Sequence, residues 1–156
     1  MKNIDLTGLN KDFFTRHKVM LAYVFGSCAK GKFGPLSDLD IAVLFSKYVG
    51  SKDYFHKESL LRSEIGKMIG AEADIINLNK SISPLLRHDA IFSGRLIFAK
   101  NKAVRFFAEN AARREFEDTR ILRNRQYGLM IRRIKTGAFG KAGLASQYLK
   151  KYVSSQ

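Results

Sequence analysis

Three short apolar runs, separated by segments with helical periodicity, place the tightest limits on the fold of this chain. The runs cover residues 19–25, 39–45 and 73–78, and each has the length expected of a buried strand. Between the second and third runs, apolar residues fall on one helical face across residues 51–70, with Ser51 as candidate N-cap and Gly70 as candidate terminator. The pattern predicts the α/β (α+β) class, with helices flanking a small mixed sheet of three to four strands.

The remaining segments extend this pattern. Short helices are expected at residues 9–17 and 83–93, the second opened by Ser83-Pro84, and an edge strand at residues 95–99. Residues 102–135 predict one long helix or two, and the glycine-containing segment 136–156 is expected to be a flexible tail. We therefore predict a main domain over residues 1–100, a basic helical extension over residues 101–135 packed on the same domain, and a tail over residues 136–156.

Charge and composition narrow the classes of function. The chain has 28 Lys and Arg against 14 Asp and Glu, a net charge of +14, which favours polyanionic partners such as nucleotides, nucleic acid or an acidic protein surface. A single cysteine excludes an intramolecular disulfide framework and a cysteine-based zinc site. No apolar run approaches the roughly 18 residues that span a bilayer, and no export signal is recognisable. We expect a cytoplasmic protein without a membrane partner.

Asp38 and Asp40 are the strongest candidates for chemistry. They flank Leu39 at the start of the second apolar run, so on a strand both carboxylates point to one face, with Cα atoms roughly 6.5 to 7 Å apart. Two aligned carboxylates are costly without a cation, and hard oxygen ligands with open positions suit Mg²⁺ that carries a substrate's phosphates. Asp74 opens the third strand and could complete the metal site or accept a proton, with Glu72 as the alternative acid.

Gly26-Ser27 ends the first strand and predicts a phosphate contact. A glycine there lets the backbone approach an anion closely, and the serine adds a hydroxyl at the start of the next helix. Residues 26–32 also match the first seven positions of a Walker A motif, but Phe33 stands where that motif needs Ser or Thr. The sequence therefore disfavours a P-loop.

The ordered set of Gly26-Ser27, a ten-residue spacer, Asp38-Leu39-Asp40 and the later Asp74 resembles the nucleotidyltransferases of the DNA polymerase beta superfamily. The short spacer is similar to that of the minimal nucleotidyltransferase (MNT) branch, and the resemblance covers residues 19–99. It implies a nucleotidyltransferase fold for the main domain and ATP as the substrate. One departure is that Ala29-Lys30-Gly31 replaces the frequent Ala-Arg-Gly, which keeps the charge but loses the forked guanidinium.

The resemblance also implies roles for individual residues. Asp38, Asp40 and Asp74 would be the catalytic residues and would hold two Mg²⁺ ions, with Asp74 as third ligand and general base. Gly26 and Ser27 would bind the nucleotide's phosphates. Lys30 is a further candidate for the triphosphate, against the alternative of an ordinary surface lysine.

Many MNT proteins accompany a HEPN ribonuclease toxin, and the resemblance implies that they act as antitoxins by attaching AMP to a tyrosine of that toxin. Transfer to a small molecule such as an aminoglycoside is an alternative, although a basic chain would repel cationic acceptors. A module that binds a toxin or RNA without catalysis is another alternative.

A basic segment at residues 113–135 is relevant to the kind of partner that the chain binds. It holds eight Arg and Lys against three Asp and Glu, 8 − 3 = +5. A solvated helical face, a docking site for an acidic protein and a contact with RNA all remain open for it.

Overall fold

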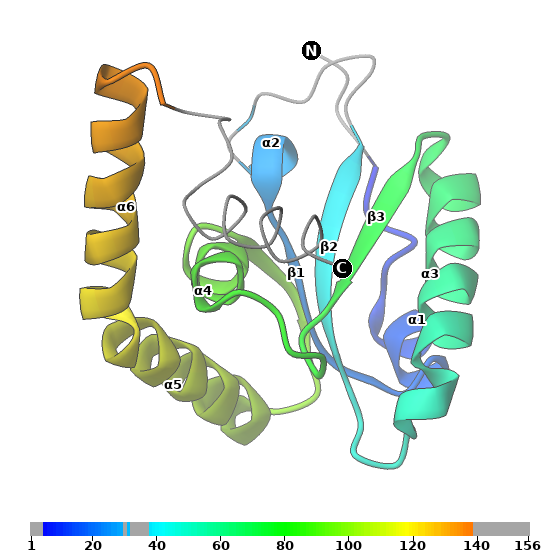
Figure 1. Cartoon of the computed structure of the whole chain (residues 1–156). Coiled ribbons are helices and arrows are strands. Elements are labelled where there is room, and N and C mark those ends of the chain that lie inside the picture. The colour runs from blue at the N-terminus through cyan, green and yellow to red at the C-terminus, as the bar shows by residue number, and fades with distance from the viewer. Residues whose placement is uncertain (1–4, 30, 32–37, 139–156) are drawn as a thin grey trace, which may run out of the picture. The chain divides into compact units, whose positions relative to one another are not determined.

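The computed structural model describes residues 5–29, 31 and 38–138, which include a four-stranded sheet (Figure 1). The strands are β1 (Val19–Val24), β2 (Leu39–Phe45), β3 (Ala73–Asn77) and β4 (Arg95–Ala99). Their order across the sheet is β3-β2-β1-β4, with β2 and β3 parallel and the other two pairs antiparallel. The predicted mixed sheet is confirmed, including its edge strand at residues 95–99.

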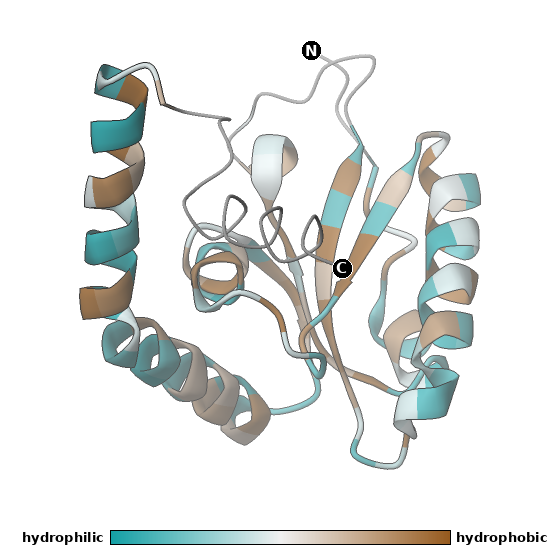
Figure 2. Cartoon of the chain, viewed as in Figure 1, coloured by the Kyte–Doolittle hydropathy of each residue, from teal (hydrophilic) through white to brown (hydrophobic). Residues whose placement is uncertain are grey.

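Helices cover both faces of this sheet. The helices of the described residues, in chain order, are α1 (Lys11–Arg16), α2 (Gly26–Ala29), the 3₁₀ helix η1 (Ser51–Asp53), α3 (Tyr54–Ile69), α4 (Pro84–Phe92), α5 (Lys102–Asp118) and α6 (Arg120–Lys135). Buried side chains of α1 and α3 pack in one core cluster, and those of α4 and α5 pack in another. Because both faces are covered, β1 and β2 are almost wholly apolar, as the hydropathy colouring also shows (Figure 2).

Alternation along β2 decides which side chains meet which helices. Ile41 and Val43 belong to the cluster that contains Leu61 and Ile65 of α3, whereas Ala42 belongs to the cluster on the α4 and α5 face. Asp40 shares the phase of Ala42 and so points toward the second face. The same alternation in β3 places Asp74 on that face, because Ala73 and Ile75 pack in the α3 cluster.

The ends of α3 and α4 show which capping predictions hold. Gly70 ends α3 in the left-handed region, with φ of 64°, as predicted. Pro84 opens α4 after Ser83, also as predicted. The prediction for Ser51 is wrong, because Ser51 begins η1 and α3 starts only at Tyr54, after Asp53.

Gly94 joins α4 to β4 at a point with no room for a side chain. A Cβ atom there would lie 2.1 Å from the carbonyl oxygen of Ala90 and 3.0 Å from that of Val24, both backbone atoms that cannot turn aside. We expect Gly94→Ala to lower the free energy of unfolding by roughly 1 to 3 kcal/mol, as overpacking does. Urea denaturation would measure this. The control is Gly128→Ala, which meets open space in α6 and should be neutral or slightly stabilising. Equal midpoints for both variants would contradict the tight packing.

The chain divides into two compact units, residues 1–117 and residues 118–156. Thr119 lies between α5 and α6, so the segment predicted as one helix or two forms two. None of the side chains of α6 is buried. The predicted division after residue 100 stays a prediction, and residues 139–156 of the predicted tail lie outside the described residues. Within the described residues, no helix is both long and apolar enough to cross a membrane.

Candidate functional site

The Gly-Ser turn and the first strand's end lie directly against Asp40. The backbone N–H of Phe25 donates to the carbonyl oxygen of Asp40 at 3.0 Å. Gly26 then adopts φ of 68°, and a Cβ atom on it would lie 2.1 Å from the Asp40 Oδ2 atom. A glycine is therefore required here for two reasons: the left-handed backbone and the carboxylate packed beside it. Ser27 follows in α2 and is partly exposed.

Two of the three predicted acids are neighbours in the sheet. Asp40 and Asp74 are second residues of β2 and β3 and pair in register, which places their Cα atoms roughly 4.8 Å apart. Asp38 is exposed and immediately precedes β2. Glu72 lies before β3, where its backbone carbonyl accepts from the N–H of Leu39 at 2.9 Å. The fold thus brings Asp40 and Asp74 together on one face, close to the Gly-Ser turn.

The electrostatics of Asp40 indicate concentrated negative charge. Partial burial raises the pKa of the Asp40 carboxyl above its ordinary value, and the charges of Asp74 and Asp38 raise that pKa further. Glu72 is not among the groups that raise it. No described carboxylate, histidine or cysteine belongs to a group of three that could hold a metal ion as the side chains stand. The assignment of Asp38, Asp40 and Asp74 as joint ligands therefore remains a proposal.

Asp74 has a basic partner that the sequence did not indicate. Arg62, on α3, donates from Nη2 to Asp74 Oδ1 at 2.9 Å. Twelve residues separate the two in the chain. No spacing motif links them, because the contact depends on how α3 packs against β3.

Arg95 is a second basic residue that sequence reasoning missed. It opens β4 and pairs in register with Val24, the last residue of β1. The pKa of the Cys28 thiol in α2 is raised above its ordinary value, chiefly by burial. The charge of Arg95 offsets part of this rise, and the charge of Asp40 adds to it. The guanidinium of Arg95 and the carboxylate of Asp40 therefore both lie near Cys28 of α2. Arg95 is exposed and forms no ion pair with any described carboxylate. Lys30, the predicted phosphate contact, lies outside the described residues.

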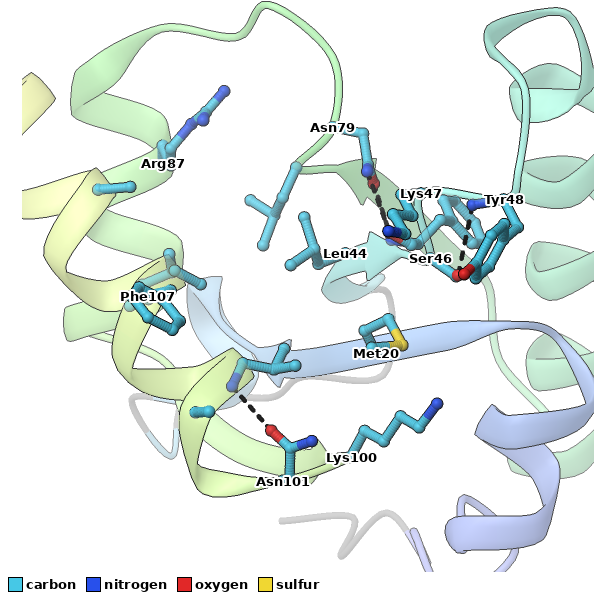
Figure 3. A pocket seen from close by; sticks show the side chains of 17 residues that line it. Met20, Leu44, Ser46, Lys47, Tyr48, Asn79, Arg87, Lys100, Asn101 and Phe107 are labelled. Carbon is cyan, nitrogen blue, oxygen red and sulfur yellow. Dashed lines mark hydrogen bonds between the residues drawn. The ribbon is translucent and has the colours of Figure 1, made fainter.

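A cavity of about 690 Å³ lies at the other end of the sheet (Figure 3). It is bordered by Met20 near the start of β1, Leu44 near the end of β2, and Phe107 of α5. Its described lining is largely apolar and contains no Asp, Glu, His or Cys. The described lining therefore offers no carboxylate, imidazole or thiol ligand for a metal ion, whereas carboxylates gather around Asp40.

The basic segment predicted at residues 113–135 is divided between the two units. Arg113 of α5 stacks over the ring of Phe92 of α4, with its guanidinium carbon 5.3 Å from the ring centroid. That contact gives Arg113 a packing role within the first unit. The remaining basic residues of the segment are Arg114 of α5 and those of α6.

Comparisons with known proteins show which proteins this chain resembles. Solved structures with the same fold include a toxin–antitoxin crystallised with AMP-PNP, with a TM-score of 0.65 and 18% identity over 77% of this chain and 94% of that chain. Another is a tri-AMPylated HEPN toxin of Shewanella oneidensis in complex with MNT antitoxin, with a TM-score of 0.58 and 17% identity over 80% of this chain and 98% of that chain. A third is the toxin–antitoxin MntA-HepT, with a TM-score of 0.57 and 18% identity over 80% and 99%.

No curated protein matches the sequence. At these identities the structural matches establish the fold, which confirms the nucleotidyltransferase architecture that the resemblance implied. The family model described as "Polymerase beta, Nucleotidyltransferase" matches residues 9–103, more than half of the 156 residues. Its match covers the Gly-Ser turn and all three predicted acids. The chain therefore belongs to the polymerase beta nucleotidyltransferase family.

Proposed function

We propose that this nucleotidyltransferase transfers AMP from ATP to a tyrosine hydroxyl of a partner HEPN ribonuclease toxin and thereby acts as an antitoxin. The main support is the placement of Asp40 beside both Asp74 and the Gly26 turn. Family membership supports nucleotidyl transfer. The choice of nucleotide and acceptor rests on similar structures. One was crystallised with AMP-PNP, and another contains a tri-AMPylated HEPN toxin in complex with MNT antitoxin.

The donor set around Asp40 fits Mg²⁺. Carboxylate oxygens are the hard ligands that Mg²⁺ prefers, and partial burial together with the charges of Asp74 and Asp38 raises the pKa of the Asp40 carboxyl. Asp38, Asp40 and Asp74 would hold two ions. When bound, these ions neutralise the triphosphate and stabilise charge on the attacking and leaving oxygens.

The protein's own groups would bind and orient the reactants. Gly26 and the hydroxyl of Ser27 would contact the phosphates at the end of β1, with Lys30 as a further candidate. The acceptor hydroxyl oxygen forms a bond to the α-phosphorus of ATP, and the bond from that phosphorus to the bridging oxygen of pyrophosphate breaks. Asp74 accepts the hydroxyl proton on a carboxylate oxygen, and pyrophosphate leaves with the bridging electrons.

Arg95 would add a positive charge for the triphosphate at the turn. Charge-assisted hydrogen bonds contribute roughly 1.5 to 3 kcal/mol, so we expect Arg95→Gln to weaken ATP binding by roughly tenfold or more. Isothermal titration with AMP-PNP and Mg²⁺ would measure the change. The matched control is Arg16→Gln, at the end of α1, where the side chain is paired with Glu64. Equal affinities for the two variants would remove Arg95 from the nucleotide site.

The proposed reaction can be tested with purified components. The chain is incubated with ATP labelled at the α-phosphate, Mg²⁺ and the product of the adjacent gene, which the proposal expects to be a HEPN protein, and the modified residue is located by mass spectrometry. We expect label on a tyrosine of the toxin and loss of its ribonuclease activity. Label on an aminoglycoside supplied in a parallel reaction, with none on the partner protein, would support the small-molecule alternative. Neutralisation of the toxin by an Asp38→Asn and Asp40→Asn double variant, without label, would support a non-catalytic binding module.

A further inference from the structure

Arg62 reaches Asp74 from the opposite side of the sheet. Its helix, α3, packs through the buried Leu61 and Ile65 on one face. The alternation of β3 directs Asp74 toward the other face. The contact is possible because β3 is an edge strand, so a long arginine side chain on α3 can pass around it; α3 and β3 lie side by side in Figure 1.

Arg62 and Asp74 are joined by a single hydrogen-bonded ion pair. Nη2 of Arg62 donates to Oδ1 of Asp74 at 2.9 Å, and each side chain is 50% exposed. A carboxylate offers about four acceptor positions on its two oxygens. The arrangement therefore neutralises Asp74 while leaving acceptor capacity on its carboxylate.

Arg62 supplies the one ion pair that any of the three acids forms within the described residues. Asp40 stands next to Asp74 in register and is itself unpaired there. Like charges at this spacing repel one another, and a positive charge beside Asp74 offsets part of that repulsion. A divalent cation at the same carboxylates would offset it too, but it would also be repelled by the guanidinium.

We propose that Arg62 takes the place of the cation at Asp74 in the metal-free protein and competes with divalent cations for that carboxylate. Arg62 is thus a positioning residue that sets the cation affinity of the site. This inference rests on the proposed function, because it takes Asp40 and Asp74 as the cation's ligands. It adds a determinant that is far from the Gly-Ser and Asp-x-Asp motifs in the sequence.

The test measures cation binding without nucleotide or toxin. Purified full-length wild type, Arg62→Gln and Arg62→Lys are titrated with Mn²⁺, and free Mn²⁺ is followed by electron paramagnetic resonance. Removing one positive charge beside a divalent ion should tighten Mn²⁺ binding roughly three- to tenfold. Arg62→Lys keeps the charge and should bind within about twofold of wild type. Arg16→Gln removes an equivalent exposed charge paired with another residue of α3 and should leave Mn²⁺ affinity unchanged.

A second readout separates competition from a merely structural role. Without metal, Arg62→Gln should have a lower Tm than wild type, and saturating Mn²⁺ should raise its Tm by more than it raises that of wild type. Unchanged or weaker Mn²⁺ binding by Arg62→Gln, with binding intact in wild type, would overturn the role of Arg62 alone. Absence of Mn²⁺ binding in wild type as well would overturn the proposed metal site, and this inference with it.

Discussion

Replacing Asp40 with asparagine is expected to reduce nucleotidyl transfer by roughly two orders of magnitude or more, because it removes a proposed metal ligand at the centre of the site. The substitution keeps the shape of the side chain, and Asp40 contributes its backbone to the sheet whichever side chain it carries. Transfer of labelled AMP to the toxin would be measured. Asp12→Asn, an exposed acid in the first turn of α1, is the control and should retain full activity.

The same substitution should not destabilise the metal-free protein. Because folding raises the pKa of Asp40, the ionised carboxylate opposes folding above that pKa, and protonation below it removes the penalty. The asparagine side chain carries no charge, so the Asp40→Asn variant should be as stable as wild type or more stable near neutral pH. The difference should vanish as the pH falls below the ordinary carboxyl range. Thermal unfolding in EDTA between pH 3 and pH 8 would measure it. Full transfer activity in Asp40→Asn would show that the metals lie elsewhere. A lower Tm than wild type near neutral pH would contradict the inference that the ionised Asp40 carboxylate opposes folding.

Replacing Gly26 with alanine is expected to have the second-largest effect. The Cβ atom of the alanine would lie 2.1 Å from Asp40 Oδ2 unless something moved, and the φ of 68° at residue 26 is unfavourable for alanine. Either the turn or the Asp40 carboxylate must move. A displacement of about 1 Å at a reacting centre can cost roughly a hundredfold in rate, so we expect transfer to fall roughly ten- to a hundredfold.

A matched glycine separates the steric contact from backbone strain. Gly70, at the end of α3, has φ of 64°, but a Cβ atom there meets nothing within 4 Å. Gly70→Ala should therefore lose roughly 1 kcal/mol of stability and keep its transfer activity. Steady-state transfer rates and urea denaturation of both variants would give the comparison. If the two variants lose activity equally, strain alone explains the loss and the contact with Asp40 has no catalytic role.

Local sequence patterns predict much of the secondary structure. The strand at residues 39–45 has the bounds that its apolar run predicts, as does the edge strand at residues 95–99. Apolar periodicity reports on burial within a few neighbouring residues, and Gly70 and Ser83-Pro84 act within one helical turn. Such signals fail where no local residue dictates the outcome. Thr119 separates α5 from α6 without Gly or Pro nearby, so the number of helices could not be decided.

The sequence by itself determined that a Gly-Ser turn would follow one strand and that Asp40 would lie on the next, because both are properties of short contiguous segments. The tertiary structure alone decided that Gly26 packs against the Asp40 carboxylate, that Arg95 lies beside Val24, and that Arg62 reaches around an edge strand to Asp74. These contacts join residues 12 to 71 positions apart, since 95 − 24 = 71. Strand order, register and helix packing set their distances, and those depend on the burial of the whole core rather than on any local pattern.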